Sequence, residues 1–276
     1  MGRSIRCRAG GMLTKRIIAC FDVVAGRVTK AQQFQDNIDV APADELATRL
    51  YDDQIDEIIF YDITASTERR KIDLDTVRAV ARRVFVPFTV GGGIRSVEDM
   101  FEVLKAGAEK ISVDSMAVRN PEIIREGSEA FGRQCIVLST QVKRVGAGPA
   151  IPSGYEVFID GARTATGMDA IEWVQRGEAL GAGEICVNSI DCDGTAAGYD
   201  LDITRAVADA VNVPVIASGG AGTVDHIADG LTTGGASAAI ISSILYSPRL
   251  ERNLGVAEIK AGLAERGIAT RPFIET

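Results

Sequence analysis

Residues 88–96 read FTVGGGIRS and residues 216–224 read IASGGAGTV, so a short apolar run leads into a glycine cluster twice in one chain. Val213 follows Val86 at an offset of 127 positions. At least seven identical pairs share this offset, which is too long a period for a solenoid, so we infer two similar halves. Besides Val86 with Val213, they include Glu57 with Glu184, Gly92 with Gly219, Gly93 with Gly220, Val97 with Val224, Gly107 with Gly234, and Ser115 with Ser242.

Each half contains four β-rich runs that alternate with amphipathic stretches such as 42–54 and 96–107. The runs are almost continuously apolar, as in parallel strands that are buried on both faces. Eight such units predict a (β/α)8 TIM barrel with a twofold half-barrel repeat. An open doubly wound sheet is the alternative, but two sets of four units favour closure. The predicted strands are 16–23, 57–63, 86–92, 110–115, 134–142, 184–191, 213–220 and 238–245.

Length and composition fit one such domain. The chain has 276 residues and is 46% hydrophobic, enough for one large core. We expect the barrel to span 12–276, after an extension, 1–11, that lacks the apolar segment of a signal peptide and is predicted to be disordered. A net charge of −8 disfavours nucleic acid and anionic membranes as partners. No apolar run approaches the length of a membrane span. The five cysteines show no CxxC spacing, so we expect free thiols and a cytoplasmic location.

Glycines follow the predicted third and seventh strands, at the end of the barrel where active sites lie. Glycine lets the main chain approach an anion closely, so each cluster with a nearby serine predicts a phosphate cradle. Glycines that only shape tight turns are the alternative. Two cradles half a barrel apart would suit an elongated substrate with a phosphate at each end. The sets are Gly92, Gly93 and Ser115, and Gly219, Gly220 and Ser242.

Seven motifs resemble the cyclase subunit of imidazole glycerol phosphate synthase. They are RIIACFDVVAGRV (16–28), FYDITAS (60–66), FTVGGGIRS, GAGE (181–184), SIDCDGT (189–195), GYD (198–200) and IASGGAG (216–222). The resemblance implies a barrel of two half-barrels that receives ammonia from a glutaminase partner. It further implies a lyase that converts a bisphosphorylated formimino-aminoimidazole carboxamide ribonucleotide to imidazole glycerol phosphate and an aminoimidazole carboxamide ribonucleotide, in histidine biosynthesis. No cofactor or metal is expected.

The same resemblance implies two catalytic aspartates, which end the first and fifth strands and act as acid and base. Asp22 matches the first. The second position is Gln141, which can form hydrogen bonds but cannot titrate. Two further departures lie nearby: Lys30 is followed by Ala31 rather than glycine, and Asp114 adds a negative charge beside a predicted phosphate site. These departures predict weak or altered activity. By resemblance, Lys30, Asp193 and Gly194 also line the substrate pocket.

Charged residues begin four of the predicted strands. The resemblance makes Arg16, Glu57, Lys110 and Glu184 a ring through which ammonia enters, although each alone is also typical of a solvated strand end. Glu109 and Gln134 are expected beside this ring at the glutaminase interface.

Two alternatives to the cyclase remain open because of Gln141. One is a paralogue that uses glutaminase-derived ammonia on a different phosphorylated or sugar acceptor. The other is a non-catalytic barrel that binds a glutaminase. His226 is the only histidine, which excludes a site built from several histidines, and we expect it to be structural.

Overall fold

The computed structural model describes residues 13–32, 35–65, 71–248 and 251–272. Eight parallel strands form a closed barrel, because β10 pairs with β7 and β12 pairs with β1. The predicted (β/α)8 barrel is confirmed, and the open sheet is wrong. In order around the barrel the strands are β1 (Arg16–Val24), β4 (Glu57–Asp62), β5 (Phe88–Gly91), β6 (Lys110–Val113), β7 (Ile136–Arg144), β10 (Glu184–Ser189), β11 (Val215–Ser218) and β12 (Ala238–Ile241).

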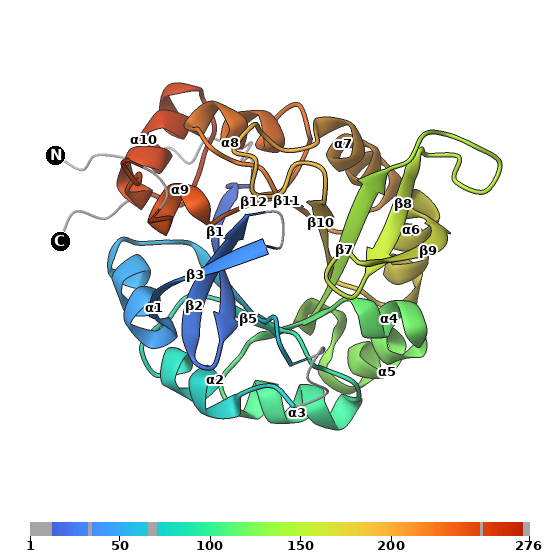
Figure 1. The fold of residues 1–276 in the computed structure, drawn as a ribbon, viewed down its shortest axis with the longest axis horizontal. Coiled ribbons are helices and arrows are strands. Elements are labelled where there is room, and N and C mark those ends of the chain that lie inside the picture. The colour runs from blue at the N-terminus through green and yellow to red at the C-terminus, as the bar shows by residue number, and fades with distance from the viewer. Residues whose placement is uncertain (1–12, 33–34, 66–70, 249–250, 273–276) are drawn as a thin grey trace, which may run out of the picture.

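Helices surround the strands, as Figure 1 shows. The halves start comparable helices in the same way: the Ser96 hydroxyl caps α3, and the Thr223 hydroxyl, 127 positions later, caps α8. The helices are α1 (Ala43–Asp52), α2 (Leu74–Ala81), α3 (Val97–Lys105), α4 (Ser115–Arg119), α5 (Glu122–Phe131), the 3₁₀ helix η1 (Arg133–Cys135), α6 (Ala170–Leu180), α7 (Leu201–Ala210), α8 (Val224–Leu231), α9 (Ser243–Tyr246) and α10 (Val256–Glu265).

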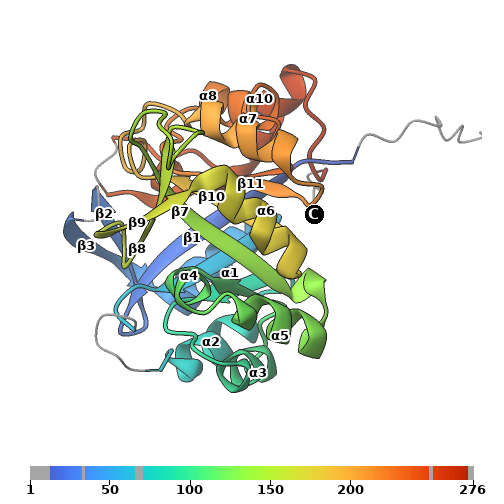
Figure 2. The same ribbon diagram turned by 90° about the vertical axis from the view of Figure 1, so that its right-hand side faces the viewer.

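Two antiparallel hairpins extend the barrel and were not among the predicted strands. β2 (Arg27–Gln32) and β3 (Gln35–Pro42) follow β1, whereas β8 (Tyr155–Ile159) and β9 (Thr164–Asp169) follow β7. Since β1 and β7 are the first barrel strands of the two halves, the hairpins repeat the internal symmetry. Both lie at the same end of the barrel (Figure 2).

Side chains alternate along each strand, so the core has two parts. On β1, Ile17, Ala19 and Phe21 belong to the large apolar cluster. Ile18 belongs to a smaller cluster of residues from six barrel strands, with Cys20 packed against it. We assign that smaller cluster to the barrel interior. The alternation then places Arg16, Ile18, Cys20 and Asp22 on the interior face, from one end of the barrel to the other.

Several predicted boundaries need correction. The strand predicted over 238–245 ends at Ile241, so Ser242 precedes α9 instead of lying within a strand. Ser115 begins α4 and does not end a strand, because β6 stops at Val113. Cys135 lies in η1, ahead of β7. The predicted extension, 1–11, lies outside the described residues, and the domain limits stay a prediction.

Candidate active site

The carboxyl end of β1 places Asp22 beside a lysine from the first hairpin. Lys30 on β2 lies 3.8 Å from the Asp22 carboxylate and donates a hydrogen bond of 2.9 Å to the Ser242 hydroxyl. Lys30 is buried, whereas Asp22 keeps about 28% of its side-chain surface exposed. Burial raises the pKa of Asp193, and Asp22 raises it further, while Lys30 opposes that shift. Lys30 therefore interacts with two carboxylates, Asp22 and Asp193, and with the Ser242 hydroxyl. These groups lie at the carboxyl ends of the barrel strands, which we call the mouth of the barrel.

The glycine clusters adopt backbone conformations that exclude a side chain. Gly92 and Gly219 have φ angles of 92° and 89°. A Cβ on Gly92 would collide with the Asp62 carbonyl oxygen, and one on Gly219 would lie 3.0 Å from that of Ser189. These are equivalent contacts, because Ser189 is 127 positions after Asp62. The turn geometry alone thus requires the glycines, so their presence does not test the phosphate prediction.

Two further predicted site residues contact each other directly. Gln141 on β7 donates from Nε2 to the Asp114 carboxylate, which follows β6, over 2.6 Å. Burial raises the pKa of Asp114 to about 7, nearby Asp160 raises it, and the Gln141 hydrogen bond and Arg119 oppose the shift. The Gln141 Oε1 atom is buried without a hydrogen-bond partner among the described residues. Asp114 therefore turns toward Gln141 and is not a fixed negative charge at neutral pH.

Ser115 contacts the second hairpin. Its hydroxyl accepts a hydrogen bond of 3.0 Å from the Asp160 backbone, in the turn between β8 and β9. The Asp160 carboxylate pairs with Arg119 through both oxygens, at 2.7 and 2.6 Å. Each hairpin thus contacts the serine of one predicted cradle: β2 contacts Ser242, and the β8–β9 turn contacts Ser115.

The predicted charged ring assembles at the amino ends of the strands. Arg16 lies 2.7 Å from Glu57 and 3.0 Å from Glu184, and Lys110 lies 3.3 Å and 3.1 Å from the same carboxylates. Both glutamates are buried. Two cations and two anions from four strands therefore neutralise one another.

Small polar groups lie between this ring and the mouth. The Tyr61 hydroxyl is 3.2 Å from the Ser112 hydroxyl. Burial raises the pKa of Tyr61 and of Cys20 well above their usual values, and that of Cys186 to about 12. These groups, with buried Ser139, are therefore neutral at physiological pH. The sequence analysis missed Tyr61, although alternation from Glu57 along β4 would have placed it inside the barrel.

The loop after β10 forms a tight turn. Asp193 donates its backbone N–H to the Ser189 carbonyl over 3.0 Å, and Gly194 has a φ of 72°. The Asp191 carboxylate accepts from the Arg144 backbone at 2.9 Å. Asp191 thus fixes the loop to β7, and Asp193 lies close enough to Lys30 and Asp22 for their charges to change its pKa.

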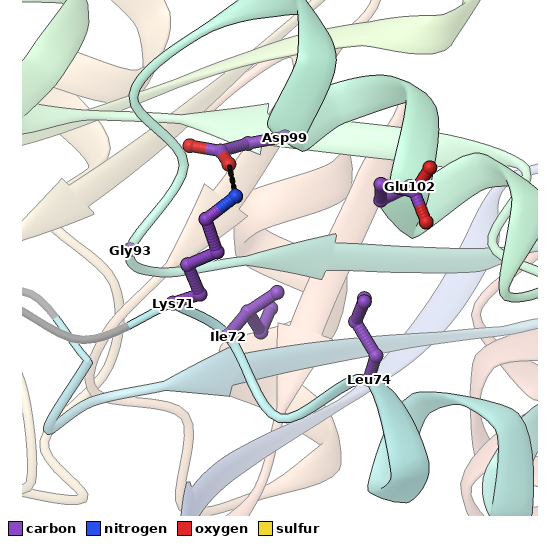
Figure 3. A pocket seen from close by; sticks show the side chains of 6 residues that line it. All are labelled: Lys71, Ile72, Leu74, Gly93, Asp99 and Glu102. Atoms are coloured by element: carbon purple, nitrogen blue, oxygen red, sulfur yellow. Dashed lines mark ion pairs between the residues drawn. The ribbon is translucent and has the colours of Figure 1, made fainter.

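A small pocket lies beside the loop that follows β5, as Figure 3 shows. Lys71 and Asp99 form an ion pair of 3.2 Å across it. The Arg95 backbone N–H also donates to Asp99, over 3.1 Å. These contacts hold the loop that carries Gly93. The lining residues are Lys71, Ile72, Leu74, Gly93, Asp99 and Glu102.

Three other predicted residues make local contacts. Glu109, which is exposed, accepts a hydrogen bond of 2.8 Å from the Phe88 backbone, and exposed Gln134 donates to the Phe131 carbonyl. His226 accepts a hydrogen bond of 3.2 Å from Gly222, in keeping with a structural role. Within the described part of the chain, no group of three His, Cys, Asp or Glu residues is placed to hold a metal, and no helix has the length and apolarity to cross a membrane.

Comparison with known proteins identifies the family. A family model described as "Histidine biosynthesis protein" matches residues 16–251. The chain belongs to this family. "Imidazole glycerol phosphate synthase subunit HisF" of Solidesulfovibrio magneticus is 55% identical over 260 residues, which cover 94% of the chain and 99% of that relative. Proteins of the same name from Syntrophobacter fumaroxidans and Oleidesulfovibrio alaskensis are 53% and 58% identical, and the chain covers 99% and 91% of them.

The expected activity, that of a cyclase and lyase subunit in histidine biosynthesis, is confirmed by these matches. They give no support to a different acceptor or to a non-catalytic barrel. In this family member Lys30 contacts both Asp22 and Ser242, and Asp114 contacts Gln141.

Proposed function

We propose that the bisphosphorylated formimino-aminoimidazole carboxamide ribonucleotide and ammonia react at the carboxyl ends of the barrel strands, with Asp22 as one acid–base group. The contact of Lys30 with both Asp22 and Ser242 carries this proposal. A single cation there both orients a carboxylate and offers positive charge to a phosphate. Addition of ammonia to the ketone carbon of the ribulosyl group needs such a carboxylate, because the nitrogen loses a proton as its bond to carbon forms.

We assign one substrate phosphate to each glycine cluster. Backbone N–H groups of glycine turns bind anions well because no Cβ keeps the anion away. Lys30 supplies a cation at the Ser242 end. At the Ser115 end, Arg119 lies near through its pair with Asp160. The twofold repeat of these features supports a substrate that is phosphorylated at both ends.

Ammonia is proposed to pass along the barrel axis from the charged ring to the mouth. β1 carries Arg16 at one end and Asp22 at the other, on the same face of the strand. Neutral hydroxyl and thiol groups between the ends, such as Ser112 and Cys186, suit a small uncharged molecule better than charged groups would.

The source of this ammonia is proposed to be a separate glutaminase at the amino ends of the strands, where Glu109 and Gln134 are exposed. Free thiols at the four described cysteines, Cys20, Cys135, Cys186 and Cys192, are in keeping with a cytoplasmic location.

Ammonia-dependent turnover of the ribonucleotide tests the role of Asp22. We expect Asp22→Asn to lower kcat about 100-fold or more, because a positioned acid or base contributes roughly 10²–10⁴-fold. Asp39→Asn is a matched control, because Asp39 is exposed on the same hairpin unit and its ion pair is with Arg27. Equal activity of both variants would refute the assignment of Asp22.

Co-purification tests the glutaminase partner. The chain and the glutaminase from the same genome should elute together at micromolar concentration, and glutamine hydrolysis should increase on mixing. A Gln134→Glu, Glu109→Lys double substitution should weaken the complex without changing ammonia-dependent turnover. Separate elution of the unaltered proteins, with hydrolysis unchanged, would reject the partner.

A further inference from the structure

The resemblance implies a second catalytic carboxylate at position 141, where this chain has glutamine. The hydrogen bond between Gln141 and Asp114 places a carboxylate directly beside that position. A titratable carboxylate is expected at Gln141, on the strand opposite β1. An amide stands there, and it donates at 2.6 Å to a carboxylate that follows the adjacent strand, β6. The carboxylate is therefore within one hydrogen bond of its expected place.

We propose that Asp114 is the second acid–base group of the cyclase reaction and that Gln141 is its positioning residue. The proposal rests on the cyclase function and on a mouth site across the barrel from Asp22. It replaces the interpretation of Asp114 as a fixed negative charge that opposes phosphate binding. Gln141 acts only through Asp114 and through its own free acceptor atom.

The geometry leaves both groups able to serve a substrate. Asp114 and Gln141 are each only half-buried. Gln141 uses its Nε2 atom to hold one Asp114 oxygen, and its Oε1 atom has no partner among the described residues. That acceptor is buried, so a donor on the substrate or ammonia reaches it only if Gln141 or its surroundings move. The other Asp114 oxygen is left for the reacting groups, because the Gln141 amide binds only Oδ2.

The charged surroundings suit a group that gives and takes a proton near neutral pH. Asp160 faces Asp114 and disfavours its ionised form, whereas Arg119 and the Gln141 amide favour it, and burial has the largest effect. Burial and, less strongly, the charge of Asp114 raise the pKa of the Cys186 thiol, on β10, to about 12, so this thiol stays protonated. A pKa of about 7 leaves roughly half of Asp114 protonated at neutral pH.

The proton balance assigns two roles. When ammonia attacks the ketone carbon, the new N–C bond forms, and the π pair of the carbonyl moves to oxygen. The carboxylate of Asp22 takes a proton from the nitrogen, and the carboxylic acid of Asp114 gives one to the oxygen. The carbinolamine then loses its hydroxyl as water: Asp22 gives that oxygen its proton, and the nitrogen returns a proton to Asp114 as the C=N bond forms. When the ring nitrogen attacks the formimino carbon, the C–N bond to the amine product breaks. The same pair carries one proton from the ring nitrogen and one from the neighbouring CH2 group to the leaving nitrogen, so both side chains end in their starting states.

Moving the carboxyl group back to the expected strand tests the proposal. The full chain is assayed with ammonium chloride and the ribonucleotide, in four forms: unaltered, Asp114→Asn, Gln141→Asp, and the double variant Asp114→Asn, Gln141→Asp. We expect Asp114→Asn to lower kcat about 100-fold with little change in KM, because proton transfer and not binding is removed. The double variant should recover at least about tenfold of that loss, since it again holds one carboxyl and one amide. Gln141→Asp alone should gain nothing, because it sets two carboxylates against each other.

A pH profile separates this role from substrate positioning. With free ammonia held saturating, kcat of the unaltered chain should fall as pH rises through about 7, and Asp114→Asn should lack that limb. A kcat equal to that of the unaltered chain, or a change confined to KM with the limb kept, would overturn the proposal. Absence of turnover in the unaltered chain would instead reject the cyclase reaction itself. If Asp114→Asn unfolds at the assay temperature, two measurements still test the proposal. They are the fall in kcat of the unaltered chain as pH rises through about 7 and the kcat of the double variant.

Discussion

The ammonium group of Lys30 lies 2.9 Å from the Ser242 hydroxyl, although 212 residues separate them in the chain. β2 carries the lysine, and the serine follows β12, and both strands pair with β1. This contact links the first hairpin to the segment after β12, at the carboxyl end of the seam where β12 pairs with β1. It also brings Lys30 within 3.8 Å of Asp22.

Replacement of Lys30 should weaken substrate binding. We expect Lys30→Met to raise KM for the ribonucleotide about 10-fold to 100-fold, because a hydrogen bond to a charged group contributes about 1.5–3 kcal/mol. Steady-state kinetics with saturating ammonia measure the effect. Arg27→Met is the matched control on the same strand, where Arg27 pairs with exposed Asp39. A fall in kcat at constant KM would show that Lys30 serves Asp22 and not a phosphate.

Glu57→Gln should disturb ammonia transfer more than catalysis. Glu57 bonds to both Arg16 and Lys110, so its loss leaves two cations with Glu184 alone. We expect the ratio of glutamine-dependent to ammonia-dependent activity to fall in the complex. The chain alone should lose about 2 kcal/mol of unfolding free energy, measured in urea.

Glu184→Gln is the control within the same ring. Glu184 uses only Oε1 for both cations, and its Oε2 atom has no hydrogen-bond partner among the described residues. A neutral amide can therefore replace part of its role, and its loss of stability should be smaller. If glutamine and ammonia support the same relative activity in both variants, the ring does not conduct ammonia.

Lys260→Met should destabilise the chain strongly. Lys260 on α10 lies 2.6 Å from Asp56, and both side chains are nearly inaccessible, at 4% and 3%. Asp56 also accepts the Ile17 backbone N–H, so the pair ties the last helix to β1. Loss of one partner leaves a buried charge, which costs about 3–5 kcal/mol.

The double variant Lys260→Met, Asp56→Asn checks that explanation. It removes both charges, and the asparagine introduced at position 56 can still accept the hydrogen bond from Ile17. Thermal unfolding should then recover most of the lost stability. A double variant as unstable as Lys260→Met would place the cost in packing and not in the unpaired charge.

Much of the barrel followed from patterns that are local in sequence. The 127-residue offset and the apolar runs predict eight parallel strands, and the ring from Arg16 to Glu184 forms at their amino ends. Of the missed hairpin strands, β9 is largely exposed and its burial shows little alternation, whereas β8 alternates in burial and could have been predicted. The strand end at Ser242 was misplaced because the apolar run continues into α9, whose residues Ile244 and Leu245 are buried.

The partner of Gln141 could not be read from the sequence, because Asp114 is 27 residues away and contacts it only through strand pairing. The same separation hid the effect of burial on Asp114. A residue's charge depends on its surroundings in the folded chain, so a carboxylate that was expected to repel phosphate has a pKa of about 7 and is partly protonated at neutral pH.

Asp114 should also make stability depend on pH. Its pKa is raised from 3.8 to about 7 on folding, so the folded chain binds its proton more tightly than the unfolded chain does. Unfolding free energy should therefore be highest below about pH 4 as far as this group is concerned, fall as pH rises from about 4 to 7, and level off above. The partial exposure of the side chain reduces the expected loss to about 1–3 kcal/mol.

Asp114→Asn should remove this slope and make the chain more stable than the unaltered protein at pH 8, because the introduced amide can still accept the Gln141 hydrogen bond without carrying a charge. Urea unfolding at pH 5 and pH 8 measures the difference, and Asp39→Asn, at an exposed ion pair, should leave the slope unchanged.

The same substitution of Asp114 is expected to lower kcat, so stability and activity should change in opposite directions at one residue. An acid–base residue held in a half-buried site has that signature, because its environment disfavours the charge that its chemistry needs. Equal slopes in the Asp114→Asn and unaltered chains would show that Asp114 is ionised throughout this range, and would remove the physical basis for its role as the acid.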